Sequence, residues 1–244
     1  MPIFNQDPIA IGQDGFTASL TPAASLGAIG KTRDGRSWRY ARAGAADLVP
    51  GNLLQGPALV TLHQNLTPVL GAQGANQLSA TLGAQAATLN QYADGYVSVD
   101  TAPGNGYQYQ ILGHAAVLSS GVITLNLRAE DAIQVALTGV SRVDLVPNPF
   151  NGVIQCPIAL TGNVVGVATY VIPATQYGWI QVTGPASVLV NGTPAIGAAV
   201  VNGATTPGSV DVITTTNLVT GTIVGTMVMT GVSGKNDTVW LRLG

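Results

Sequence analysis

The residues with the clearest potential for chemistry lie at positions 25–42. Residues 25–32 read SLGAIGKT, which is similar to the phosphate-binding loop G-x-x-x-x-G-K-[ST]. In that loop, backbone N–H groups of the glycines surround the phosphates and the lysine supplies positive charge. Here Ser25 replaces the first glycine, no buried hydrophobic strand precedes the segment, and residues 33–35 indicate a turn where a helix should begin. We therefore do not predict a nucleotide site.

A basic and aromatic cluster follows directly, in residues 31–42 with the sequence KTRDGRSWRYAR. This window carries a charge of +4 within a chain of formal net charge −2, so the rest of the chain carries −6. Arginine, tryptophan and tyrosine are the residue types that anchor protein interfaces, through carboxylate contacts and large rigid apolar area. The candidate interface residues are Arg33, Arg36, Trp38, Arg39, Tyr40 and Arg42.

Three interpretations of this cluster remain open. If the segment is an extended strand, its even-numbered residues share one face and Arg39 points to the other. The same composition could contact nucleic acid through phosphates and base stacking, or could be a solvated hairpin with a buried tryptophan. One short cluster on an acidic chain is a weak electrostatic footprint for nucleic acid. The sequence therefore favours a protein interface.

The other reactive residues do not predict catalysis, a cofactor or a metal site. His63 and His114 have no His, Cys or carboxylate at metal-ligand spacing, and we expect His114 to be a hydrogen-bonded core residue. The single Cys156 allows no internal disulfide and is expected to be buried and inert. The chain contains no G-x-S-x-G nucleophile motif. We expect a non-enzymatic protein.

The composition points to a packed chain that lies against other proteins. Charged residues make up 8% of the 244 positions, against about 25% in ordinary globular proteins. Hydrophobic residues make up 46% and the mean hydropathy is +0.35, which is the opposite of the disordered signature. Since charge keeps protein surfaces apart, we expect much of this surface to contact a partner.

Neither a membrane segment nor a secretory signal is expected. Residues 145–210 contain no charged side chain, but prolines and glycines interrupt them and no 18-residue apolar run remains. Residues 1–20 lack a basic region followed by a continuous apolar run.

The elements that must position these residues are predicted to be strands. Short runs of Val, Ile, Thr and Tyr alternate with seven Asn-Gly or Asp-Gly pairs, which accept the positive φ angles of tight hairpin turns. The predicted strands from residue 96 onward are 96–100, 107–117, 122–128, 140–146, 153–158, 164–172, 179–182, 187–190, 210–213, 223–230 and 238–243. We predict an all-β fold of antiparallel barrels or sandwiches with an irregular N-terminal arm. At most one or two short helices are expected, at residues 129–137 and 47–54, and both segments could equally be loops.

Three zones follow from this pattern. Residues 1–50 form a polar, glycine-rich arm that is expected to need a partner to become ordered, and residues 51–149 form a first β region. The prolines at 147 and 149 mark a junction, and residues 150–244 form a small β-barrel or sandwich domain.

Several stretches resemble structural proteins of tailed bacteriophages. Residues 34–55 (DGRSWRYARAGAADLVPGNLLQ) and 90–114 (NQYADGYVSVDTAPGNGYQYQILGH) are similar to the capsid decoration, or cement, proteins of the phage head. The strand series in residues 164–184 (VVGVATYVIPATQYGWIQVTG), 195–201 (AIGAAVV) and 223–229 (IVGTMVM) is similar to the β domains that phages use to clamp capsomers. The resemblance covers most of the chain from residue 31 onward.

This resemblance implies a structural protein on the outer surface of the capsid, made in the host cytoplasm. Such proteins commonly form homotrimers at local threefold axes and cross-link neighbouring major capsid subunits. The implied partners are the major capsid protein and further copies of this chain, with no nucleic acid and no membrane. Binding only the expanded, mature shell would stabilise that state.

Two other functions remain open. A phage tail or baseplate component would share the β-rich, weakly charged texture, although the chain lacks the long repetitive segments of tail fibres. A carbohydrate- or surface-binding β module would need exposed Trp and Tyr side chains gathered at one site.

Overall fold

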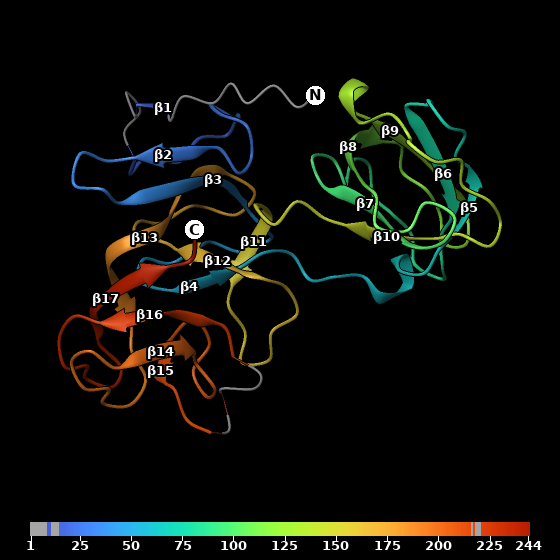
Figure 1. Cartoon of the computed structure of the whole chain (residues 1–244). Coiled ribbons are helices and arrows are strands. Elements are labelled where there is room, and N and C mark those ends of the chain that lie inside the picture. Colours follow the sequence, from blue (N-terminus) through green and yellow to red (C-terminus); the bar gives the residue numbers. More distant parts are fainter. Residues whose placement is uncertain (1–8, 11–14, 216, 218–220) are drawn as a thin grey trace. The chain divides into compact units, whose positions relative to one another are not determined.

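The protein is nearly all β, as predicted. The computed structural model describes residues 9–10, 15–215, 217 and 221–244 (Figure 1). Within these residues, strands β1 to β17 are accompanied only by two short 3-10 helices, η1 (Thr61–His63) and η2 (Ala129–Asp131). Of the two segments considered as helices, residues 129–137 contain only the 3-10 helix η2, and residues 132–137 are not helical. Residues 47–54 form no helix, and strand β4 (Leu53–Gln55) begins near their end.

The chain folds into two compact units, and the segment that forms one of them is inserted within the sequence of the other. The insert unit contains residues 59–148, and the barrel unit contains the described residues before 59 together with residues 149–244. The junction expected at the proline pair lies within one residue of the second boundary. Residues 15–58, by contrast, belong to the same unit as the C-terminal region, and they include strands β2 (Ile29–Lys31) and β3 (Ser37–Ala43). The part of the expected arm at residues 1–8 and 11–14 lies outside the described residues.

The insert unit is a curled antiparallel sheet with the strand order β10-β7-β8-β9-β6-β5. A bridge between Leu66 and Val143 brings the start of β5 back to β10. Alternation of buried and exposed residues is complete in β9, where Ile123, Leu125 and Leu127 face the core. The strands are β5 (Thr67–Leu70), β6 (Gln77–Thr81), β7 (Tyr96–Thr101), β8 (Gln108–His114), β9 (Val122–Leu127) and β10 (Arg142–Val146).

Both histidines lie in the core of the insert unit, on either side of Tyr92. Nδ1 of His63 is 2.5 Å from the Tyr92 hydroxyl, and Nε2 of His63 is 2.9 Å from the carbonyl oxygen of Gln85. Nε2 of His114 accepts the backbone N–H of Tyr92 at 3.1 Å, and its Nδ1 is 2.8 Å from the carbonyl oxygen of Ala115. The expectation of a hydrogen-bonded core histidine is confirmed for His114. Because carbonyl oxygens only accept, His114 carries its proton on Nδ1 and is neutral.

The barrel unit contains a closed five-stranded barrel in which each strand pairs with the next and the last returns to the first. The ring runs β3-β11-β4-β12-β13, and β13 pairs again with β3. Only the β3–β11 pairing is parallel. The barrel core includes Ala41, Leu54, Val153 and Ile180. The remaining ring strands are β11 (Asn151–Gln155), β12 (Val164–Val167) and β13 (Tyr177–Leu189), while β2 and β1 (Ile9–Ala10) extend the sheet beyond β3.

Strand β13 continues beyond the barrel into a second antiparallel sheet with the order β13-β17-β16-β14-β15 (Figure 1). Its core side is lined with valines, including Val188, Val200 and Val239. A bridge between Val190 and Val210 brings β15 back to the end of β13. These strands are β14 (Ala199–Asn202), β15 (Val210–Val212), β16 (Ile223–Met227) and β17 (Asn236–Arg242).

Acid is expected to destabilise the insert unit through His114. Burial is the main cause that lowers the pKa of this imidazole below its ordinary value of 6.5. In the unfolded chain the ring binds a proton near pH 6.5, whereas the folded unit keeps it neutral to lower pH. The contribution of His114 to stability is therefore complete above about pH 6.5 and is lost as the pH falls toward the folded pKa, by at most about 1.4 kcal/mol per pH unit.

Urea unfolding at pH 8 and at pH 5.5, followed by NMR of the histidine ring protons, measures this effect, because both histidines lie in the insert unit. The control is His114→Gln, which removes the titrating group and should flatten the pH dependence while lowering stability at pH 8. Equal urea midpoints for the wild type at both pH values would contradict the prediction.

Candidate protein interface at the β2–β3 hairpin

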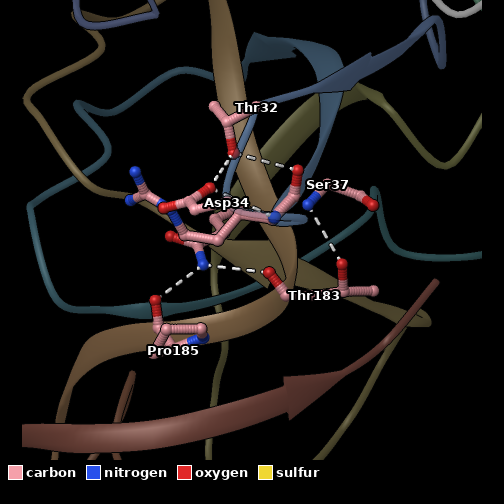
Figure 2. Close-up of polar contacts among 7 residues, drawn as sticks. Thr32, Asp34, Ser37, Thr183 and Pro185 are labelled. Carbon is pink, nitrogen blue, oxygen red and sulfur yellow. Dashed lines mark hydrogen bonds and ion pairs between the residues drawn. The ribbon is translucent and has the colours of Figure 1, made fainter.

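The basic cluster forms an antiparallel hairpin of β2 and β3, and the turn between them is held by polar contacts (Figure 2). The Thr32 hydroxyl donates to the Asp34 carboxylate, and Nε of Arg36 forms an ion pair with Asp34 at 2.8 Å. The hydrogen bond from Thr32 is the main cause that lowers the pKa of Asp34, and Arg36 contributes further. Gly35 occupies the left-handed position of the turn, with φ of +86°. A turn and a strand thus follow the SLGAIGKT segment, where a phosphate-binding loop would begin a helix.

The two aromatic residues of the cluster are buried within the chain. Trp38 and Tyr40 are each 2% exposed and pack with Trp179 of β13. Residues of the N-terminal segment cover them: the Phe16 ring contacts Trp38 edge-on, and the Tyr40 hydroxyl accepts the Ala23 backbone N–H at 2.9 Å. The expectation that Trp38 and Tyr40 supply interface area is therefore corrected, because residues 16–28 already occupy that face of β3.

Three of the cluster's arginines make contacts inside the chain. Arg36 lies over the Trp38 ring, in addition to its ion pair with Asp34. Arg39 donates to the carbonyl oxygen of Gly27 at 2.9 Å, and Arg42 donates to that of Thr175 at 3.1 Å. Their guanidinium groups also lie over the rings of Phe150 and Tyr177, respectively.

Arg33 differs from the other arginines of the cluster. It is exposed, and its side chain makes no hydrogen bond or ion pair with the residues that the structure describes. Among the predicted interface residues, Arg33 is therefore the one with its whole charged group available to a partner.

Next to the hairpin, β13 bends as it passes from the barrel into the second sheet. The buried Gln181 amide donates to the carbonyl oxygens of Thr183 (3.0 Å) and Pro185 (2.9 Å), and the Ser37 backbone N–H donates to the Thr183 hydroxyl at 3.0 Å (Figure 2). Gly184 has a φ of +82°, and a Cβ there would lie 2.8 Å from Cγ of Arg36. The bend requires glycine, and the hairpin packs directly on it.

Cys156 is buried in the core of the second sheet, as expected, and burial raises its thiol pKa to about 11. Within the described residues, no three His, Cys, Asp or Glu side chains come together in a way that could hold a metal ion. A search of the described residues also finds no helix with the length and apolar character needed to cross a membrane.

The sequence-based cluster missed two exposed residues on β17, Trp240 and Arg242. Trp240 is 50% exposed, whereas its neighbours Val239 and Leu241 are buried. The alternation in the sequence TVWLR carries this information, because residues two positions apart on a strand share a face. With Val239 and Leu241 facing the core, Trp240 and Arg242 face outward.

Replacing Trp38 with alanine should destabilise the barrel unit. The substitution leaves a cavity under residues 16–28 and should lower the free energy of unfolding by about 3–5 kcal/mol. Urea unfolding followed by circular dichroism measures this. The matched control is Arg33→Ala in the same hairpin, which should change stability by less than about 0.5 kcal/mol. Equal midpoints for Trp38→Ala and the wild type would show that Trp38 is not a core residue.

A second substitution tests the bend. Gly184→Ala imposes both the positive-φ strain, about 1–3 kcal/mol, and a contact with Arg36. The control is Gly192→Ala, because Gly192 has a similar φ of +76° but nothing within 4 Å of an added Cβ. Thermal unfolding should show a larger loss of stability for Gly184→Ala, and a loss no larger than that of the control would exclude the steric role of the bend.

No family model, no curated protein and no solved structure matches the chain. The interpretation of the site therefore depends on its residues and their contacts. The site consists of a hairpin with buried aromatic side chains and an exposed basic turn, and an outward-facing tryptophan on β17 lies next to it.

Proposed function

We propose that this chain is a non-enzymatic structural protein of a tailed-phage virion, which binds the outer surface of the head as a decoration protein. Its partners in this proposal are the major capsid protein and further copies of the chain, arranged as a homotrimer. The mechanism is passive. Preferential binding to the mature shell lowers the free energy of that state and holds neighbouring capsid subunits together.

The observation that carries the proposal is an apolar tip at one end of the second sheet. The loop before β14 and the loop after β16 lie side by side there. The Gly197 backbone N–H donates to the Met227 carbonyl oxygen at 2.9 Å, and the Gly231 N–H donates to that of Pro194 at 2.8 Å. The large apolar side chains exposed on these loops, which we call the apolar tip, are Ile196, Val228, Met229 and Val232.

Clustered apolar side chains on exposed loops are typical of protein interaction sites. Charge does little to oppose association, since charged residues make up only 8% of the chain and the described residues contain two ion pairs. Other large apolar side chains are also exposed, among them Leu20 (79%) and Leu118 (82%). This apolar and weakly charged surface supports the proposal that the protein functions in contact with other subunits of an assembly.

A tail or baseplate component is the alternative within the same class, and the apolar tip supports it equally. A carbohydrate-binding module is less well supported. Trp38, Tyr40 and Trp179 do gather at one site, but that site is buried, so these rings offer no platform on which a sugar could stack.

Sedimentation with phage heads tests the proposal. We expect the purified protein to have a mass near three times 24.7 kDa by light scattering and to co-sediment with mature heads more tightly than with precursor shells. The variant Ile196→Ser/Met229→Ser should weaken this binding about tenfold or more without unfolding.

The matched control is Leu20→Ser/Val49→Ser, which removes two exposed apolar side chains from the barrel unit outside the tip. This control should bind heads like the wild type. A stable monomer that ignores both kinds of shell would refute the proposed function. Binding to isolated tails or baseplates but not to heads would support the alternative.

A further inference from the structure

Four adjacent strands of the barrel unit present one row of polar and basic side chains. Lys31 of β2 pairs with Ser37 of β3, Ser37 pairs with Thr183 of β13, and Thr183 pairs with Arg242 of β17. Directly opposed residues on neighbouring strands point to the same face of a sheet. Two exposed cations thus stand at the ends of a row whose middle positions are hydroxyl groups.

The half-exposed Trp240 lies on the same face, next to this row. It precedes Arg242 by two residues on β17, so both side chains point the same way. Pro185, which is exposed, lies directly opposite Trp240 on one side, and Thr226 lies opposite on the other. We call the surface formed by these residues, together with the turn residue Arg33, the Trp240 face: Lys31, Arg33, Ser37, Thr183, Pro185, Thr226, Trp240 and Arg242.

The positive charges of the Trp240 face are unpaired. Lys31, Arg33 and Arg242 make no side-chain hydrogen bond or ion pair with any described residue, and Asp34 is already paired with Arg36. The other described carboxylates of the barrel unit each accept a backbone N–H within the chain, and they are Asp47, Asp211 and Asp237. Among its described residues the unit thus has four exposed cations, of which Lys31, Arg33 and Arg242 belong to the Trp240 face and Lys235 does not, whereas each described aspartate already accepts a hydrogen bond.

We propose that the Trp240 face binds an acidic segment of the partner protein. Carboxylates of that segment pair with Lys31, Arg33 and Arg242, and an apolar side chain packs on Trp240 and Pro185. A guanidinium group binds carboxylates in a bidentate geometry, and an exposed tryptophan beside arginine is the usual composition of an interface anchor. The inference rests on the proposed function and specifies the chemistry of the capsid surface that the chain would recognise.

The composition of the face favours a protein partner over nucleic acid. Binding of single-stranded nucleic acid uses several aromatic rings along a positively charged groove, whereas here one tryptophan lies beside three free cations.

Binding of fluorescently labelled poly-L-glutamate tests the surface directly. We expect salt-sensitive binding to the full-length chain, accompanied by a change in tryptophan fluorescence that is lost in Trp240→Phe. The variant Lys31→Ala/Arg242→Ala should weaken binding at least about tenfold. The control is Lys235→Ala, because Lys235 is also exposed but precedes the opposite end of β17. Circular dichroism confirms that each variant is folded.

Three results would overturn the proposal. The first is a loss of poly-L-glutamate binding in Lys235→Ala as large as that in Lys31→Ala/Arg242→Ala. The second is tighter binding of an oligodeoxythymidylate that carries the same charge as the poly-L-glutamate. The third is a loss of self-association in Lys31→Ala/Arg242→Ala, which would assign the face to a second copy of the chain. Sedimentation with heads separates this inference from the function on which it rests. Head binding that is unaffected by the double variant would refute the acidic-partner surface alone. Poly-L-glutamate binding without any head binding would refute the proposed function and leave the surface standing.

Discussion

The barrel unit depends on one strand that belongs to two sheets. Residues 177–183 of β13 complete the barrel by pairing with β3, and residues 183–189 pair with β17 in the second sheet. A straight strand cannot serve both, because each sheet buries its own apolar face. The bend is possible because Gly184 adopts a positive φ and because the Gln181 side chain satisfies two carbonyl groups at the irregularity.

The β2–β3 turn and the Trp240 face are both arranged around this bend. The β2–β3 turn packs on it through Arg36, and Thr183 connects the row of side chains that runs from Lys31 to Arg242. A change in the angle of β13 would move β17, and with it Trp240, relative to the basic turn. The alignment of an outward tryptophan with these cations is therefore a consequence of strand geometry inside the unit.

Local patterns in the sequence were sufficient for much of the fold. The alternation in β9 and the Asn-Gly and Asp-Gly pairs predicted strands and turns that the structure contains, including positive φ angles at Gly35, Gly106 and Gly152. The same reasoning divided β13 into two strands. Gly184 and Pro185 locally resemble an interruption, whereas pairing with β3 and β17 keeps the strand continuous through them. Strand β4 was missed because it is short and buried at every position, which leaves no alternation to detect.

At the candidate site, local sequence patterns likewise did not reveal which side chains are buried and which partners they contact. Composition located the cluster, but the burial of Trp38 depends on residues 16–28, and the partner of Arg42 is Thr175, far away in the sequence. Such long-range contacts leave no local periodic signal. Trp240 is the opposite case, because alternation within β17 places it outside once the core positions are known.

The chain leaves the barrel unit and returns to it at neighbouring points, which bears on how the insert unit can be replaced during evolution. Gly56 and Pro149 are in close backbone contact, since a Cβ on Gly56 would lie 2.7 Å from the Pro149 carbonyl oxygen. The ninety residues of the insert unit therefore connect two points of the barrel unit that lie close enough for a short loop to join them. Gene fusion or recombination at this point can exchange the whole insert while preserving every strand pairing of the barrel. The insert unit can then change in sequence or size without altering the fold of the barrel unit.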